Sequence, residues 1–368
     1  MESGWLTTGA RTREFEATFA EFVGSAHAVA LNSATAALHL GLEAFGVGAG
    51  DEVIVPTWTF TASAEVIVYR GARPVLVDVE GETLNASLEA IVAAITPRTR
   101  AVMAVHIAGR PMAVRELVGE LSPRGIAVIE DTAHAFPSRI GGASGPLAGT
   151  VGAVGAYSFY ATKTITTGEG GMLVTDDPAI ADRARLMSLH GISHDAWKRY
   201  TAAGSWYYEV EDAGFKYNMT DMAAAMGLVQ LSRAEELLSA RRELAATYAL
   251  RIARSSVGDL IELPTDAPDG SHAWHLYIVR LALERLTLDR GQVIDGLKEL
   301  GIGTSVHFIP LHLHPYYRRD WGYRAPDFPV ASHEYQRVIS LPIWPGMSTA
   351  DIERVVRGLE VVVGGARR

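Results

Sequence analysis

One lysine, Lys163, lies in a run of small, apolar and hydroxyl-bearing side chains that contains no other cation, residues 156–167. Such surroundings remove an amine from water, which disfavours its charged form and leaves a nucleophile that can form a Schiff base. Ser158 offers a hydroxyl for a phosphate, and the turn Glu169-Gly170-Gly171 permits close approach of the backbone. The alternative is a lysine that ends a strand and extends into solvent. This stretch alone leaves covalent chemistry at Lys163 and the solvent-exposed lysine equally open.

Two acids end a predicted buried strand upstream of the lysine, in Val128-Ile129-Glu130-Asp131. A carboxylate at such a position costs free energy unless a cation or a hydrogen-bond donor meets it. A protonated pyridinium nitrogen is one such partner for Asp131, and His134 can then donate to a phenolic oxygen of the same ring. Capping of the following turn by Asp131 and simple packing of His134 are the alternatives.

Two further segments follow predicted strands. Asn32-Ser33-Ala34-Thr35 opens a helix whose free N–H groups and dipole favour an anion, although plain N-capping explains the same residues. Pro56-Thr57-Trp58-Thr59-Phe60 places two aromatic side chains where one can lie flat on a ring, unless both belong to the core. A phosphate site, a stacking aromatic, an acid for a ring nitrogen and a desolvated lysine together predict a site for pyridoxal 5′-phosphate (PLP).

The segments that must position these residues alternate between β-branched runs and helical patterns. The predicted strands are Glu52–Val55, Val75–Val79, Ala101–His106, Ala127–Asp131, Ala153–Phe159 and Met172–Asp176. The predicted helices are Ala34–Phe45, Phe60–Tyr69, Ser87–Ile95, Met112–Leu121 and Pro178–Gly191. The alternation indicates an α/β fold with a mainly parallel sheet that is covered on both faces and binds ligands at the carboxyl ends of its strands.

A second, smaller α+β domain is predicted after a long helical pattern over residues 222–253. There we expect strands at 272–281 and 305–309, and helices at 290–300, 328–339 and 350–363. The boundary near residue 240 gives a large PLP-binding domain over 1–240 and a small C-terminal domain over 241–368.

Composition narrows the class of protein. The 368 residues are 48% hydrophobic and 20% charged, which is typical of a globular chain long enough for two cores. The absence of cysteine excludes thiolate catalysis, disulfides and cysteine-based zinc sites, and we expect no metal. A net charge of −9 argues against nucleic-acid binding. No stretch resembles a membrane span or a signal peptide, so we expect a cytoplasmic protein without a membrane partner.

The combination of motifs resembles the DegT/StrS family of nucleotide-sugar aminotransferases, which have the aspartate-aminotransferase-like architecture (PLP fold type I). Its most specific element is Glu130-Asp131-Thr132-Ala133-His134, followed by the lysine segment that ends in Glu169-Gly170-Gly171. A second signature is Gly214-Phe215-Lys216-Tyr217-Asn218-Met219-Thr220-Asp221. The resemblance covers nearly the whole chain. It implies a mainly parallel, seven-stranded sheet in the large domain.

The resemblance also implies roles for residues of the predicted site. Lys163 forms the Schiff base with the cofactor, and Asp131 pairs with its ring nitrogen, as the two catalytic residues. The phosphate is bound by Ala34, Thr35 and Ser158. During turnover the cofactor alternates between PLP and pyridoxamine 5′-phosphate, with L-glutamate as the amino donor and 2-oxoglutarate as its product.

Further contacts to the cofactor follow from the same resemblance. The resemblance puts Phe60 in the stacking position, for which Trp58 is the competing candidate; His134 is expected at the phenolic oxygen from its place after Asp131 alone. Asn218 reaches the phosphate of the neighbouring subunit, which implies a homodimer with shared active sites. Thr8, Lys216 and His307 are expected on the substrate side. For His307 the alternative is a strand histidine packed between the domains.

Three segments resemble the branch that acts on UDP-4-keto-pentoses, the UDP-4-amino-4-deoxy-L-arabinose–oxoglutarate aminotransferases. They are residues 3–9, 272–276 and 301–304. The resemblance implies amination at C4 of a UDP-4-keto-pentose or a dTDP- or UDP-linked 4-keto-6-deoxyhexose, which makes an amino sugar for a natural product or a cell-surface glycan. The loop at 309–315 differs from this branch, and relatives carry a further helix before residue 3, so we expect part of the entrance wall to be missing.

Other functions fit parts of the pattern. A 3-keto-sugar aminotransferase has the same motifs. A PLP-dependent sugar dehydratase of this fold has a histidine in place of the lysine, which argues against that function, and a non-catalytic PLP-binding sensor would not need the full set of site residues. A nucleotide-binding dehydrogenase fits the sheet pattern, but no G-x-G-x-x-G follows the early strands.

Overall fold

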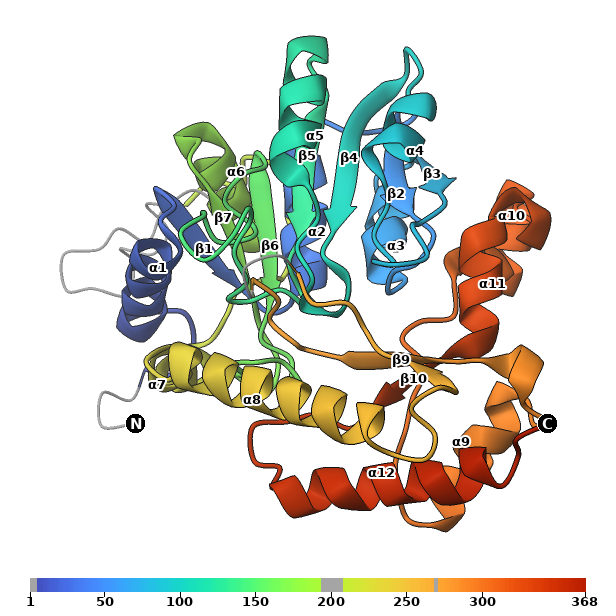
Figure 1. Ribbon diagram of the computed structural model, residues 1–368. Helices are drawn as coiled ribbons and strands as arrows, with labels where there is room; N and C mark the ends of the chain where they lie inside the picture. The colour runs from blue at the N-terminus through green and yellow to red at the C-terminus, as the bar shows by residue number, and fades with distance from the viewer. Residues whose placement is uncertain (1–4, 193–207, 268–270) are drawn as a thin grey trace.

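A seven-stranded sheet runs through the N-terminal part of the chain in the order β1-β7-β6-β5-β4-β2-β3 (Figure 1). The computed structural model describes residues 5–192, 208–267 and 271–368. The strands are β1 (His27–Leu31), β2 (Glu52–Pro56), β3 (Arg73–Val77), β4 (Thr99–Val105), β5 (Ala127–Asp131), β6 (Val154–Ser158) and β7 (Gly171–Thr175). Strands β2 to β6 pair in parallel, whereas β7 is antiparallel to both β1 and β6. The predicted mainly parallel sheet is confirmed.

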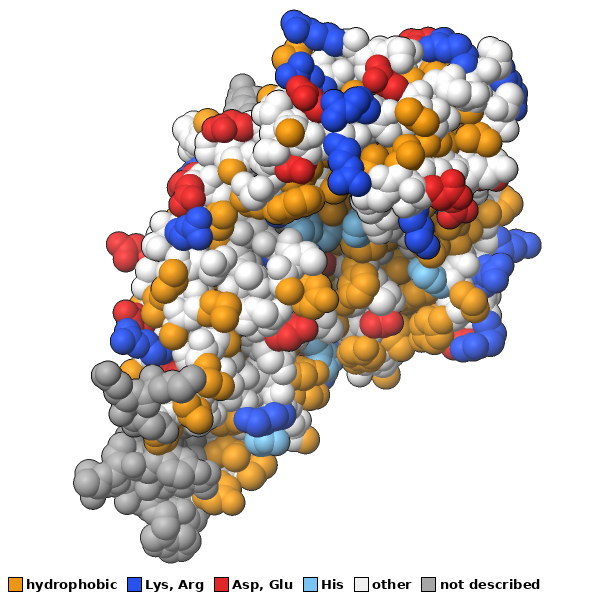
Figure 2. Space-filling model, turned by 90° about the horizontal axis from the view of Figure 1, so that it is seen from below, with side chains coloured by type: hydrophobic (Ala, Val, Ile, Leu, Met, Phe, Trp, Pro, Cys, Tyr) orange, Lys and Arg blue, Asp and Glu red, His pale blue; other side chains and the backbone are white. Residues whose placement is uncertain are grey.

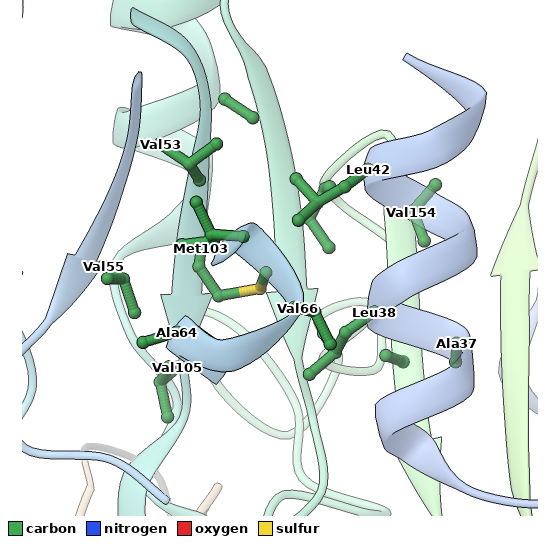
Figure 3. Packing of buried hydrophobic residues seen from close by; sticks show 14 of the residues in the cluster. Ala37, Leu38, Leu42, Val53, Val55, Ala64, Val66, Met103, Val105 and Val154 are labelled. Carbon is green, nitrogen blue, oxygen red and sulfur yellow. The ribbon is translucent and has the colours of Figure 1, made fainter. Parts of the chain in front are cut away.

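Helices cover both faces of this sheet. They are α1 (Ala10–Val23), α2 (Ala34–Ala44), α3 (Ala62–Tyr69), α4 (Leu88–Ala93), α5 (Val114–Leu121) and α6 (Pro178–Ser188). Side chains alternate between the two faces along each strand. In β2, Val53 and Val55 therefore pack in one apolar cluster with α2 and α3, while Ile54 packs in another with α4 and α5. Figure 3 shows the first cluster, in which Leu38 and Leu42 of α2 lie beside the strands.

The C-terminal part contains a three-stranded antiparallel sheet in the order β10-β9-β8. Its strands are β8 (Ile261–Glu262), β9 (Tyr277–Leu281) and β10 (Val338–Leu341). The helices are α7 (Asp221–Leu231), α8 (Ala234–Ala253), α9 (Arg290–Glu299), α10 (Pro315–Trp321), α11 (Pro329–Arg337) and α12 (Thr349–Gly364). One apolar cluster joins this sheet to α8, α9 and α12. Residue 240 lies inside α8 (Figure 1), and the division into 1–240 and 241–368 stays a prediction.

Several predicted elements differ from the structure. The helix expected over 328–339 ends at Arg337, because the β-branched run that follows pairs with β9 as strand β10. The strand expected over 305–309 is wrong, since this segment makes an isolated bridge between Ser305 and Ser340. The long helical pattern is interrupted at Ser232 and Arg233, between α7 and α8. The sequence reasoning also missed α1 and α10. Within the described part of the chain, no helix has the length and apolar character to span a membrane.

The carboxylate of Glu130, in β5, fixes the segment that leads into β6. Its oxygens accept hydrogen bonds from the backbone N–H groups of Gly149 (2.8 Å), Val151 (2.8 Å) and Gly152 (2.5 Å), and the His106 ring lies 2.9 Å away. The side chain is fully buried. Burial raises the pKa of Glu130, but the bonds from His106 and the backbone outweigh burial and hold the pKa below its ordinary value.

We expect Glu130→Gln to lower the free energy of unfolding by about 3 kcal/mol at pH 7, because buried donors lose a charged acceptor. Since the pKa of Glu130 is lower in the folded state than in the unfolded state, its contribution is present above about pH 4.3 and is lost as the pH falls through the folded value. Urea unfolding at pH 7 and at a series of pH values below about 4.3 measures both effects. The exposed Glu21→Gln in α1 is the control, with an expected change under about 0.5 kcal/mol. A difference that grows toward acid pH would contradict the prediction.

Candidate active site

A cavity of about 460 Å³ opens at the carboxyl ends of the parallel strands. Such ends meet at one edge of a sheet, where ligands of open α/β folds bind. Figure 2 looks onto this end of the molecule, where histidine side chains lie in a hollow of the surface. The residues of the N-terminal part that line the cavity include Ser33, Ala34, Thr35, Thr59, Phe60, His106, Asp131, His134, Ser158, Tyr160, Lys163, Glu169 and Gly170. The C-terminal part adds His275, His307 and Phe308.

Lys163 follows β6 and presents its amine to this cavity. Burial lowers the pKa of Lys163 to about 8; the nearby Asp131 carboxylate opposes this change and the Arg241 guanidinium adds to it. A measurable fraction of the amine is therefore uncharged at neutral pH. Lys163 is partly buried and lines the cavity, as the composition of its segment led us to expect, and its role as a nucleophile stays a prediction.

Asp131 is the last residue of β5 and is only 7% exposed. One carboxylate oxygen accepts a hydrogen bond from the Ser63 hydroxyl at 2.7 Å, and the other accepts one from the backbone N–H of Ala133 at 3.1 Å. Asp131 and Lys163 line the same cavity because β5 and β6 are neighbouring parallel strands. The bond to Ala133 also shows that Asp131 stabilises the following turn, as the capping alternative required.

The N-terminus of α2 forms one end of the cavity. Ser33 caps the helix by accepting a hydrogen bond from the N–H of Ala36 at 3.1 Å, and the N-terminal residues Ala34 and Thr35 line the cavity. Gly171 of β7 allows this arrangement, since a Cβ there would lie 2.5 Å or less from backbone atoms of Ser33 and Ala34. A helix N-terminus with free N–H groups, in the same cavity as the Ser158 hydroxyl, fits a phosphate.

Of the two aromatic residues expected to stack on the cofactor ring, one lines the cavity and the other lies in the core. Phe60 lines the cavity and is 57% exposed, whereas Trp58 is fully buried and its indole N–H donates to the carbonyl of His307 at 3.1 Å. The stacking position is therefore open to Phe60, and Trp58 is a core residue that holds the chain beside His307.

Three histidines lie around the amine of Lys163. The ring of His134 lies 4.5 Å from that of His275 and 5.5 Å from that of Phe308, and His307 is 2.9 Å from the Ser340 hydroxyl. Burial, with the charge of Lys163 as a further cause, lowers the pKa of all three histidines. Neutral rings add no positive charge that would further disfavour protonated Lys163, and each can donate one hydrogen bond and accept another.

Three predicted residues lie outside the cavity and form a group of their own. The Lys216 ammonium donates to the side-chain carbonyl of Asn218 at 2.5 Å, and the Asn218 amide donates to the Thr8 hydroxyl at 2.8 Å. Thr8 in turn donates to the carbonyl of Met219 at 2.6 Å. Asn218 lines a second, shallower depression that shares Glu169 with the main cavity. One chain therefore does not bring Thr8, Lys216 or Asn218 to Lys163.

Sequence reasoning missed several residues of the site. Ser63 and His275 are the most relevant, because one contacts Asp131 and the other packs on His134. His275 is 7% exposed and belongs to the segment 272–276, from which the sequence indicated only a resemblance to one branch of a family. Ser63 lies four residues after Thr59, but its contact with Asp131, 68 positions away, has no signal in the local sequence.

The cavity fits PLP in its donor set. The start of α2 and Ser158 offer hydrogen-bond donors to a phosphate, Asp131 offers a carboxylate to a ring nitrogen, and Lys163 offers an amine to an aldehyde. The fold and the site thus match an enzyme class that uses a lysine and an acid at the carboxyl edge of an α/β sheet.

Comparisons with known proteins agree with this class. The chain is 46% identical over 367 residues to the spore coat polysaccharide biosynthesis protein SpsC of Bacillus subtilis, covering 100% of this chain and 93% of SpsC. It superposes with a TM-score of 0.90 on the PMP form of the putative sugar aminotransferase Spr1654 from Streptococcus pneumoniae, at 32% identity over 99% of this chain and 94% of that one. DesI, solved in the presence of its TDP-sugar product, gives a TM-score of 0.84 at 32% identity over 98% of this chain and 86% of DesI.

The chain belongs to the DegT/DnrJ/EryC1/StrS aminotransferase family, which it matches over residues 1–360. The predicted family, the aspartate-aminotransferase-like fold and the aminotransferase class are confirmed.

We expect the amine of Lys163 to titrate near pH 8, because burial disfavours its charged form. Reductive methylation of the cofactor-free protein across a pH series, with each lysine quantified by mass spectrometry, measures the midpoint directly. The exposed Lys298 on α9 monitors reagent consumption in the same sample. A midpoint for Lys163 near the ordinary lysine value of about 10.4 would contradict the prediction.

Proposed function

We propose that the protein is a PLP-dependent aminotransferase that moves an amino group from L-glutamate to C4 of a nucleotide-linked keto sugar. The observation that carries the proposal is the cavity in which Lys163, Asp131 and the N-terminus of α2 converge. Support for the cofactor comes from the PLP and PMP forms of Spr1654, and support for a nucleotide sugar comes from the TDP-sugar product of DesI.

The chain's own residues hold and orient the cofactor. PLP supplies an aldehyde for an amino group and a ring that takes up electrons when a bond at the adjacent carbon breaks. Backbone N–H groups at the start of α2 and the Ser158 hydroxyl bind its phosphate, and Asp131 keeps a proton on the ring nitrogen. Phe60 covers one face of the ring, and neutral His134 donates to the phenolic oxygen. Together these residues would hold the cofactor in the cavity at the carboxyl edge of the sheet.

Lys163 is the proton carrier in this proposal. With a pKa of about 8, its amine is close to the balance between charged and uncharged forms at neutral pH, which suits a group that both accepts and returns a proton. It would accept the proton from the α-carbon of L-glutamate; water would supply the keto oxygen of the departing 2-oxoglutarate, and the amino group would stay on the cofactor. In the second half of the reaction it returns a proton to the sugar carbon, and its position fixes the stereochemistry at that carbon.

The C4 assignment is the finer part of the proposal. It is supported by the resemblance of three segments to enzymes of UDP-4-keto-pentoses, one of which includes His275. In the structure His275 and His307 belong to the wall that the C-terminal part contributes to the cavity. A sugar that enters beside this wall would meet neutral imidazole groups that can hydrogen-bond to hydroxyls. Amination at C3 requires a different placement of the same sugar ring against these two side chains.

We expect the purified protein, with PLP and L-glutamate, to aminate 4-keto sugars from a panel of UDP- and dTDP-linked 3-keto and 4-keto substrates. Mass spectrometry and NMR of the products identify the position, and 2-oxoglutarate should appear in equal amount. Lys163→Ala and Lys163→Arg should reduce turnover by more than about 1,000-fold, because the proton carrier is lost. Lys298→Ala, on the surface of α9, is the matched control. Products aminated only at C3 would contradict the C4 assignment, and wild-type protein that gains no visible absorbance with PLP would contradict the cofactor assignment.

The assembly is proposed to be a homodimer that completes its active sites across the interface. The group formed by Thr8, Lys216 and Asn218 lies outside the cavity of its own chain, beside a depression that shares Glu169 with that cavity. Next to this group, α7 presents an apolar stripe to the surface, which is typical of an interaction face. The exposed side chains of the stripe are Met222, Met226 and Val229.

Mixing two inactive variants tests the shared site. Lys163→Ala keeps Asn218, and Asn218→Ala keeps Lys163, so a mixed dimer contains one complete site. After random reassortment of equal amounts we expect about a quarter of the wild-type activity, since half of the dimers have one intact site of two. Each variant alone should remain near background, and light scattering should give the mass of two chains. Full activity of Asn218→Ala alone, or no recovery in the mixture, would contradict the proposal.

A further inference from the structure

Two buried hydroxyl groups lie behind Asp131. Ser63, in the first turn of α3, is fully buried and its hydroxyl oxygen is 2.7 Å from one carboxylate oxygen of Asp131. Thr59 is 2% exposed, and its hydroxyl oxygen is 2.8 Å from that of Ser63. Both distances are normal for strong hydroxyl hydrogen bonds. Thr59, Ser63 and Asp131 therefore form a chain that begins at the wall of the cavity and ends at its acid.

The chemistry of the three groups fixes the direction of this chain. An ionised carboxylate accepts hydrogen bonds and donates none, so the Ser63 proton lies toward Asp131. The oxygen of Ser63 is then left as an acceptor, and Thr59 must donate to it. Because the N–H of Ala133 occupies the other carboxylate oxygen, each oxygen of Asp131 has its own donor. The plane of the carboxylate is thereby held on both sides.

We propose that Thr59 and Ser63 are positioning residues that hold the Asp131 carboxylate against the ring nitrogen of the cofactor. The inference rests on the proposed function, in which Asp131 pairs with that nitrogen. Neither hydroxyl group is assigned a contact with the reacting atoms. Both act through the acid, whose hydrogen bond to a charged partner is strong only at a fixed distance and angle.

Loss of the Ser63 hydroxyl has a definite consequence for the bound cofactor. A carboxylate held by Ala133 alone can rotate, and its pairing with the ring nitrogen weakens. The ring then withdraws less electron density from the bond that joins the cofactor to Lys163. The nitrogen of that bond then keeps its proton to a higher pH. The visible absorbance of the cofactor, which reports this proton, therefore changes with a midpoint at a higher pH.

The experiment measures that midpoint for holoenzyme by absorbance across a pH series. We expect Ser63→Ala to raise it by about one pH unit, a tenfold change in the proton equilibrium. Thr59→Val, which keeps the shape of the side chain, should raise it by a smaller amount. The double variant should shift no further than Ser63→Ala alone, because Thr59 acts through Ser63 and the two effects are coupled.

A matched control separates positioning from packing. Ser138 is also fully buried, but its hydroxyl donates to the carbonyl of Ala135, and Ser138→Ala should leave the midpoint unchanged. A wild-type midpoint in Ser63→Ala would overturn the inference, as would additive shifts in the double variant. If Ser63→Ala does not fold, an unshifted midpoint in Thr59→Val would also overturn it. Wild-type protein without any PLP absorbance would instead overturn the proposed function, so the two failures are distinguishable.

Discussion

The site depends on one electrostatic balance, the cost of charging the Lys163 amine inside a cavity that also holds the Asp131 carboxylate. Burial disfavours the ammonium form and the carboxylate favours it, and the outcome is a pKa of about 8 instead of the ordinary 10.5. A stronger attraction would leave a permanent cation with no nucleophilic electron pair. Deeper burial without the acid would remove the charged form, which in the proposed function returns a proton to the sugar carbon. The arrangement of the strands sets this balance, because β5 and β6 are adjacent and end at the same edge.

Strand β5 can present an acid to the cavity because a second acid fixes its other face. Successive side chains of a strand point to opposite sides, so Asp131 and the adjacent Glu130 face different surroundings. Glu130 accepts hydrogen bonds from three backbone N–H groups of the segment before β6. It also contacts the ring of His106, which in turn accepts a hydrogen bond from the N–H of Met112. Every carboxylate oxygen at this strand end therefore has donors, and two buried charges are tolerated where an unpaired one would be costly.

Sequence patterns were reliable where local chemistry decides the structure. The strand Ala127–Asp131 was predicted with its observed bounds, and the start of α2 and the environment of Lys163 followed from composition and spacing. Patterns failed where the partner is distant in the chain. The start of the run at 338–341 was predicted to continue a helix. The run forms strand β10 because it pairs with β9 through antiparallel hydrogen bonds. Ser63 contacts Asp131, which is 68 positions away in the chain, and the sequence around Ser63 does not indicate this contact.

The two halves of the cavity differ in how they are held, and this difference bears on specificity. The PLP side is built on strand ends and a helix terminus, which regular backbone hydrogen bonds keep in place. The C-terminal wall consists of segments without regular secondary structure, which side chains of other elements hold by hydrogen bonds to their backbone carbonyls. The buried Arg241 donates to the carbonyls of Trp274 (3.1 Å) and His275 (3.3 Å), and Trp58 donates to that of His307. Such loops can change their side chains without altering the sheet. We therefore infer that the fixed half serves the chemistry common to the family, and that recognition of a particular sugar resides in the wall of His275 and His307.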